Sequence, residues 1–244
     1  MSLRDLFAPR RPLPPALTLE QPSVTVALRV NARARRFTLR LAAPGSTEGA
    51  ILTLPPGVPL AHVETFLAEH RGWLARALAE QPEGRRPAPG GVLPVDGALV
   101  PLVAGTHRGP PVLDAGRLVL PGGRRHGPVL AAWLKERARQ RLVPAAHRYA
   151  EALGCRPTAI SLRDTRSRWG SCSSAGRLAF SWRLAMAPPE VQDYVAAHEA
   201  AHLREMNHST RYWAHVERLM PDYAPRRAWL RKEGRSLHAY CFGG

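Results

Sequence analysis

Two kinds of apolar spacing alternate along the first half of the chain. Segments in which apolar residues alternate with polar or small ones lie between glycines and prolines. They predict β-strands over residues 24–30, 37–42, 50–54, 98–104 and 117–120. The stretch from residue 60 to residue 79 instead spaces its apolar residues at helical intervals and predicts one helix. This half is therefore expected to be a small sheet with a helix.

The second half opens with a long helical pattern over residues 129–153, which Pro144 is expected to kink or divide. A short strand is predicted over 159–163, and a half-buried strand over 177–186 follows a loop. A further helix begins at Pro188 and Pro189, residues suited to a first helical turn. The order helix, strand, loop, strand, helix predicts an α+β fold whose last helix packs on a small sheet.

Changes in composition divide the chain into three parts. Residues 1–22 hold many prolines and no periodic pattern, so we expect a disordered tail rich in proline and arginine. The pattern changes again near Gly127. We therefore predict a β-rich subdomain with one helix over 23–126 and a second domain over 127–244.

The chain has a formal net charge of +16, and Lys135 and Lys232 are its only lysines, so almost all the positive charge is arginine. Such a field attracts anions, whether nucleic acid, nucleotide or acidic peptide. Charge alone identifies no site, and solvated basic faces explain it equally well.

The cysteine content and the length of the apolar segments indicate where in the cell the protein is expected. The chain has three scattered cysteines, Cys155, Cys172 and Cys241, with no CxxC spacing, which favours reduced thiols over disulfides or a cysteine-based zinc site. No apolar run approaches the roughly 20 residues of a membrane helix, and no signal peptide is visible. We expect a cytoplasmic protein without a membrane partner.

The segment from His198 to His202, with the sequence HEAAH, carries the clearest chemistry. Two histidines four residues apart lie on one face of a helix, where their imidazoles can bind one divalent ion. Glu199 then flanks the open coordination position. Three neutral ligands and an open position are the arrangement of catalytic zinc, which predicts a hydrolase with Glu199 as general base.

A third ligand is needed, and His208 is the first candidate. It can reach the metal only if the helix ends before it, because six further helical residues would carry it to another face. Asn207 could end the helix in the left-handed conformation, and Ser209 could cap the next one. Glu205 and the more distant Glu217 are the competing ligands.

Taken together, several segments resemble the YgjP-like metallopeptidase family, relatives of the SprT-like zincins. The resemblance is carried by Arg166–Ser173 (RSRWGSCS), the HEAAH helix, Asn207-His208-Ser209 and Trp213, and more loosely by Arg35–Arg40 and Pro55-Pro56-Gly57. It implies a zincin-like fold with one Zn²⁺ per chain, His198, His202 and His208 as ligands, and a catalytic Glu199.

The loop before the 177–186 strand contains Arg166, Arg168 and Trp169. These side chains are candidates for lining the substrate cleft, since arginine can grip a carboxylate or phosphate with two hydrogen bonds. The alternative is structural, with Trp169 filling the core and the arginines paired to local carboxylates. Cys172 has no feature nearby that would activate its thiolate.

Three functions remain open from the sequence. The first is a zinc peptidase whose substrate adds as a strand along residues 177–186. The second, implied by the resemblance, is a pyrophosphatase acting on UTP at the same zinc site. The third is a SprT-like protease acting at DNA, although no nucleic-acid-binding motif is present. Arginines near the motif favour an anionic substrate, namely Arg166, Arg168, Arg183, Arg204 and Arg211.

Overall fold

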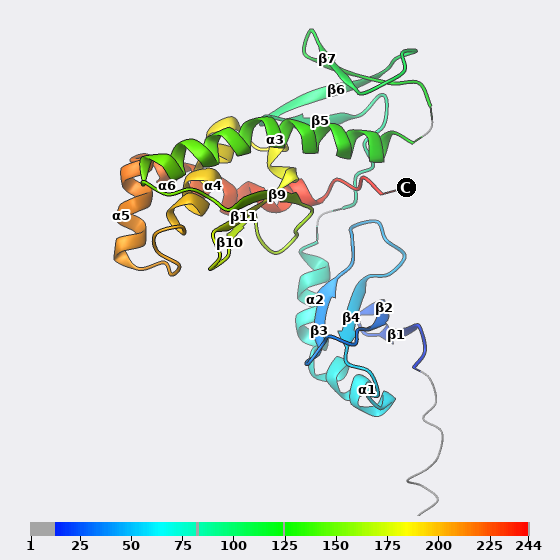
Figure 1. The fold of residues 1–244 in the computed structure, drawn as a ribbon. Coiled ribbons are helices and arrows are strands. Elements are labelled where there is room, and N and C mark those ends of the chain that lie inside the picture. The colour runs from blue at the N-terminus through cyan, green and yellow to red at the C-terminus, as the bar shows by residue number, and fades with distance from the viewer. Residues whose placement is uncertain (1–12, 82, 124, 244) are drawn as a thin grey trace, which may run out of the picture. The chain divides into compact units, whose positions relative to one another are not determined.

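The computed structural model describes residues 13–81, 83–123 and 125–243. Packing divides the chain into two compact units, one ending at Gly84 and one beginning at Arg85. Both mix helices with small sheets, as Figure 1 shows, so the fold is α+β as expected. Among the described residues, no helix is long and apolar enough to cross a membrane.

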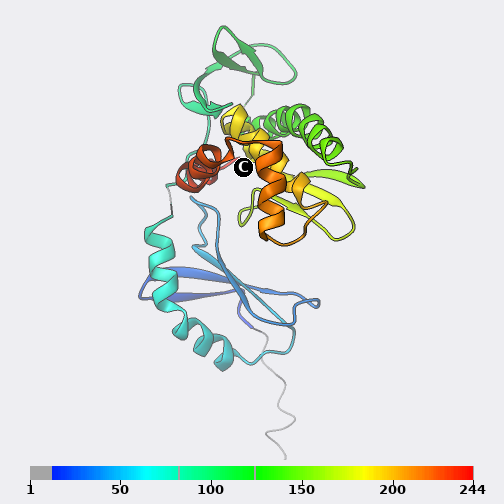
Figure 2. The same cartoon turned by 90° about the vertical axis from the view of Figure 1, so that its left-hand side faces the viewer.

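The first unit is a four-stranded sheet with two helices on one face (Figure 2). Its strands are β1 (Ala16–Glu20), β2 (Ser23–Val30), β3 (Thr38–Leu41) and β4 (Ala50–Leu54), in the spatial order β1-β2-β4-β3. The helices are α1 (Leu60–Glu69) and α2 (Arg71–Ala79). Every second residue of β4 is buried, and these side chains pack in one cluster with Val63, Leu67 and Leu74 of the helices.

Two features of this unit differ from the sequence prediction. The single helix expected over 60–79 is broken at His70, whose ring stacks on Phe66 and whose Nδ1 lies 2.8 Å from the Phe66 carbonyl oxygen. Residues 16–20, expected in the tail, form β1, because their backbone pairs antiparallel with β2. Residues 1–12 of that tail lie outside the described residues.

The second unit opens with another four-stranded sheet. Its strands are β5 (Val92–Val95), β6 (Ala98–Ala104), β7 (Val112–Asp114) and β8 (Arg117–Leu120), in the order β5-β6-β8-β7. Asp96 and Gly97 join β5 to β6 with positive φ at both positions, the two-residue turn that matches strand twist. The turn is fixed against the rest of the unit, because Asp96 pairs with Arg137 and accepts a hydrogen bond from Gln192.

The packing therefore places a boundary elsewhere than the predicted 126/127. Apolar side chains of β5, β6 and β8 share one core with those of the long helix that follows, including Leu93, Leu102, Leu118, Leu130 and Leu134. The β-rich region 23–126 is consequently split between the two units at Gly84. The sequence could not show this, since alternation identifies a strand without naming what covers it.

The remainder of the second unit holds the HEAAH segment. It consists of α3 (His126–Ala152), β9 (Ala159–Arg163), β10 (Gly170–Cys172), β11 (Arg177–Ser181), the 3₁₀ helix η2 (Trp182–Met186), α4 (Pro189–Ala201), α5 (Thr210–Leu219), α6 (Tyr223–Glu233) and the 3₁₀ helix η3 (Gly234–His238). Helix α3 runs beside α4 (Figure 1) and is continuous through Pro144, which neither divides nor ends it.

The strand predicted over 177–186 is shorter than expected. Leu178 and Phe180 are buried in β11 as the alternation indicates, but residues 182–186 form η2, in which every residue is buried. Burial on all sides is incompatible with a half-exposed strand. The sheet order is β10-β11-β9, so β11 is the central strand and its backbone is paired on both sides. The prediction that a peptide adds along this strand is therefore wrong.

Candidate metal centre

The histidines at 198, 202 and 208 converge at the end of α4. One nitrogen from each lies within 4.8 Å of the others, and Nε2 of His198 lies 3.3 Å from Nε2 of His208. Helix α4 supplies the first, its C-terminal cap supplies His202, and the turn before α5 supplies His208. Among the described residues this trio is the one cluster with the composition and spacing of a metal site.

The chain turns back to the centre earlier than the sequence suggested. Helix α4 ends at Ala201, and His202 is its cap. The described non-glycine residues with positive φ are Asp96 and Ala115, so Asn207 does not end the helix in the left-handed conformation. Ser209 does cap α5 as predicted, since its Oγ accepts a hydrogen bond from the Tyr212 amide at 3.3 Å.

Glu205, the nearer competing ligand, contributes its backbone and not its carboxylate. Nδ1 of His202 lies 3.0 Å from the Glu205 carbonyl oxygen, to which it donates its proton. The Glu205 carboxylate lies 3.9 Å from Arg211. Glu217 is likewise absent from the cluster that the described residues form. The hydrogen bond leaves Nε2 of His202 as the nitrogen with a free lone pair.

Two tyrosines hold the imidazoles in place. The Tyr212 ring stacks on His202 at 4.4 Å, and its hydroxyl donates to the His198 carbonyl oxygen at 3.0 Å near the end of α4. The Tyr194 hydroxyl lies 3.4 Å from Nδ1 of His198. These contacts orient Nε2 of His198 toward the other two rings.

The donor set fits a divalent metal ion. Burial lowers the pKa of His198 to about 3, assisted by His202, His208 and Arg227, and burial also lowers the pKa of His202. Both rings are therefore neutral, as metal ligands must be. Tetrahedral zinc with Zn–N distances of about 2.0–2.1 Å separates its ligand nitrogens by about 3.3–3.4 Å. The 3.3 Å between His198 and His208 matches that separation.

Glu199 is a buried carboxyl group without a compensating partner. It is 5% exposed, and within the described chain its Oε2 has no hydrogen-bond partner. Burial raises its pKa to about 8, although the charge of Arg168 acts in the opposite direction. A buried, unsatisfied carboxyl group is costly for folding, which indicates a role other than stability.

Gly170 is the residue that presses against this carboxyl group. A Cβ at position 170 would lie 2.4 Å from Oε1 of Glu199 and 2.5 Å from its Cγ. Its φ is not positive, so this glycine is required by the close approach and not by a left-handed backbone conformation. Sequence reasoning missed the contact; the signal was a glycine that opens a strand, where close backbone approach is a usual cause.

The neighbouring thiol does not compete as a nucleophile. The pKa of Cys172 is raised to about 11 by burial and by the charge of Glu199. It is therefore protonated at neutral pH, in agreement with the sequence expectation.

Trp169 packs on the C-terminal segment. Its ring stacks on His238 at 4.7 Å, and a Cβ at Gly234 would lie 3.2 Å from it. Burial lowers the pKa of His238 to about 4, aided by Arg183 and Arg166 and opposed by Asp164. This placement matches the structural alternative for Trp169 rather than a side chain free to contact substrate.

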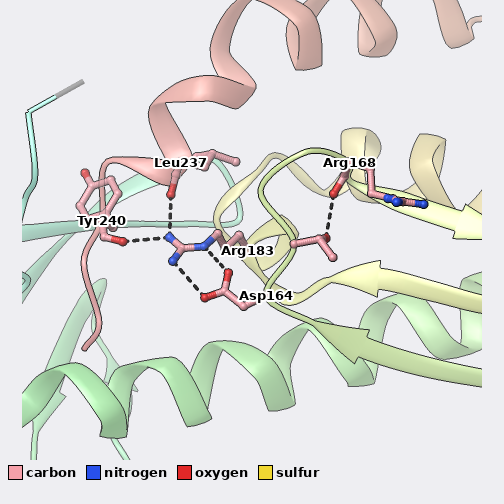
Figure 3. A network of polar contacts seen from close by, with 6 residues as sticks. Asp164, Arg168, Arg183, Leu237 and Tyr240 are labelled. Carbon is pink, nitrogen blue, oxygen red and sulfur yellow. Dashed lines mark hydrogen bonds and ion pairs between the residues drawn. The ribbon is translucent and has the colours of Figure 1, made fainter. Parts of the chain in front are cut away.

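The two arginines of the same loop are exposed. The charge of Arg168 acts on Glu199, which puts it near the reacting groups, and its carbonyl oxygen accepts a hydrogen bond from Thr165 at 2.8 Å (Figure 3). The charge of Arg166 acts on His238 and not on the histidine trio. Of the pair, Arg168 is therefore the one whose charge reaches Glu199.

Arg183 has a structural role, which Figure 3 shows. Its guanidinium is 3% exposed, pairs with Asp164 at 2.6 Å, and donates to the carbonyl oxygens of Leu237 and Tyr240 at 3.1 and 2.8 Å. Arg204 is similarly engaged, donating to the Leu153 carbonyl oxygen at 2.9 Å after α3. These two arginines therefore do not support the prediction of an anionic substrate.

A family model described as YgjP-like, metallopeptidase domain, matches residues 36–233. No curated protein matches the chain. Four chains of solved structures match; one is the crystal structure of the metallopeptidase zymogen of Pyrococcus abyssi abylysin, with 19% identity, a TM-score of 0.34, and coverage of 38% of this chain and 93% of that one. Because the family model spans well over half of the sequence, the chain belongs to the YgjP-like metallopeptidase domain family.

Proposed function

We propose that this protein is a zinc-dependent peptidase, in which His198, His202 and His208 hold one Zn²⁺ and Glu199 is the general base. The observation that carries the proposal is the convergence of three imidazoles within 4.8 Å of one another at the end of α4, the helix that bears the buried carboxyl group of Glu199. Membership of a metallopeptidase family supports hydrolysis as the reaction class.

The residues divide the work between them. When bound, zinc supplies a positive charge that polarises the scissile carbonyl and acidifies a water molecule. Glu199 accepts the proton of that water and delivers it to the leaving amine. Burial raises the pKa of this carboxyl group, and the charges of Arg168 and of a bound metal ion act in the opposite direction, which favours the carboxylate that accepts the proton. The backbone of Gly170 lies close against one side of the carboxyl group.

The edge strand β10 offers the substrate a backbone to pair with. It is the end strand of its sheet, and it begins at Gly170, in contact with Glu199. A peptide extended along β10 would bring its carbonyl groups past the metal centre, with main-chain hydrogen bonds supplying affinity. This replaces β11 as the proposed docking strand.

Metal analysis combined with a substrate panel tests the proposal. We expect one zinc per chain and cleavage of casein or a peptide library, lost on chelation and restored by zinc. Glu199→Gln should abolish turnover and retain zinc, whereas Glu217→Gln, which changes an exposed glutamate of α5, should behave as wild type. Cleavage that persists in Glu199→Gln would contradict the assigned role.

The same panel covers the two alternatives. Pyrophosphate release from UTP, lost in Glu199→Gln, with no peptide cleaved would favour a nucleotide pyrophosphatase using the same centre. Binding to DNA that weakens steeply with salt and survives removal of the metal would favour action at nucleic acid.

A further inference from the structure

Two basic side chains of helix α6, Arg227 and Arg231, have no carboxylate partner within the part of the chain that the structure describes. Other basic residues of the same helix are paired, Arg226 with Asp222 and Lys232 with Glu233. Arg227 is half-buried, so its charge is partly removed from water without an opposite charge to compensate.

Arg227 lies beside the metal centre. Its guanidinium carbon is 4.4 Å from the centre of the Trp213 ring. That ring is in turn 6.0 Å from the rings of both His198 and His208. A single indole therefore separates the guanidinium from the metal-binding imidazoles, and α6 itself packs against α4.

The charges of this pair extend over the same region. Burial raises the pKa of Tyr194, and the charges of Arg227 and Arg231 oppose that rise; the charge of Arg227 also adds to the lowering of the pKa of His198 that burial causes. Arg227 therefore lies near the metal centre, and the charge of Arg231, one helical turn further along α6, reaches Tyr194.

The surface next to them is a shallow hollow that is open to solvent. A hollow of about 430 Å³ runs along α6 and is lined by Tyr223, Ala224, Arg227, Ala228, Arg231 and Lys232. Alanines at two of these positions leave space between the longer side chains. The hollow is thus basic and open on its outer side.

We infer that Arg227 and Arg231 form an anion-binding subsite that holds a carboxylate of the peptide substrate while the scissile bond lies at the metal centre. The inference rests on the proposed peptidase function and adds a specificity to it. An extended chain advances about 3.3–3.6 Å per residue, so an acidic residue within about three positions of the cleaved bond can reach this subsite. Arginine holds a carboxylate through two parallel hydrogen bonds, and stacking on Trp213 fixes the plane of the guanidinium.

A purely structural role for Arg227 makes a different prediction. If the guanidinium only packs on Trp213 to hold α6 against α5, its removal should affect every substrate equally. A subsite should instead change the preference between acidic and neutral peptides.

The test uses quenched-fluorescent peptides that are identical except for Asp, Asn or Lys at each position within three residues of the cleaved bond. For wild type, we expect kcat/KM to be about 10- to 100-fold higher for one Asp peptide than for its Asn counterpart, the range of a charge-assisted pair. In Arg227→Gln this ratio should fall to near one, and in Arg227→Glu a Lys peptide should become the preferred substrate. Arg218→Gln, which removes an exposed charge of α5, should keep the wild-type ratio.

Binding provides a second measurement that needs no turnover. Labelled Asp and Asn peptides are titrated by fluorescence anisotropy into Glu199→Gln protein with and without Arg227→Gln, after melting curves confirm folding. If Arg227→Gln weakens binding of the Asp peptide and leaves binding of the Asn peptide unchanged, the subsite is upheld. This holds even if no peptide is cleaved, and then only the peptidase proposal fails. Equal affinities for Asp and Asn peptides, or an equal loss for both, would overturn the subsite. Displacement of the labelled Asp peptide by UTP at concentrations far below those needed of unlabelled Asp peptide or inorganic phosphate would also overturn the carboxylate assignment in favour of a nucleotide.

Discussion

Replacing Gly170 with alanine should disable the proposed general base while leaving the metal centre intact. The added methyl group would lie 2.4 Å from Oε1 and 2.5 Å from Cγ of Glu199. Ordinary contacts begin near 3.4 Å, so the carboxyl group must move by about 1 Å. The backbone of Gly170 needs no positive φ, and alanine is therefore accommodated without local backbone strain.

The expected loss of rate in Gly170→Ala is large, whereas the expected loss of unfolding free energy is small. A displacement of about 1 Å at a reacting group can cost about 100-fold in rate, equivalent to about 2.7 kcal/mol of activation free energy. Overpacking costs about 1–3 kcal/mol of unfolding free energy, and alanine recovers about 0.4–1 kcal/mol by restricting the unfolded chain. The protein should stay folded, because domains typically have about 5–15 kcal/mol to lose.

Three measurements on the same preparations decide the matter: kcat on the best peptide, zinc content, and the melting temperature. Gly72→Ala is the matched control, since nothing lies within 4 Å of a Cβ there, and it should retain full activity. A Gly170→Ala protein with kcat within threefold of wild type would refute the reasoning. So would a proportional loss of zinc, which would show that the change disturbs the ligands.

Three further predictions concern the ligands and the fold. His208→Ala should weaken zinc affinity by more than about 100-fold in a competition titration, because a ligand is lost. His215→Ala on α5 is the control and should bind zinc like wild type. If His208→Ala and wild type bind zinc equally well, His208 is not a ligand. Arg183→Met should lower the unfolding free energy by about 2–4 kcal/mol in urea, because carbonyl groups and a carboxylate lose their partner, while Arg29→Met, in an exposed pair, should cost less than about 1 kcal/mol. The folded-state pKa of His238, about 4, lies below its unfolded value of 6.5, so the unfolded chain binds more protons between these values and stability falls on acidification through that window. Between these pH values the unfolding free energy of His238→Phe, followed by thermal melting, should therefore fall by about 1–2 kcal/mol less than that of wild type. Identical dependence of stability on pH in the two proteins would contradict the lowered pKa of His238.

The sequence by itself determined the elements whose cause is local. Apolar spacing predicted the helix that carries His198 and Glu199 and the strands β2, β3 and β4, because side-chain period follows directly from backbone geometry, whereas β1 was missed. Ser209 was predicted as a cap from its hydroxyl alone. His208 was the preferred third ligand from spacing, and the structure brings it to the other two histidines.

Only the tertiary structure decided the relations between distant segments. Alternation could not show that β11 lies between two strands, that residues 182–186 are buried on every side, or that β5 to β8 share a core with α3. Gly170 contacts Glu199, which is 29 positions further along the chain. Arg227 approaches the histidine trio through Trp213, although it lies 19 positions after His208. Such contacts depend on how helices and sheets pack, and a local periodicity carries no information about the surface that an element will meet.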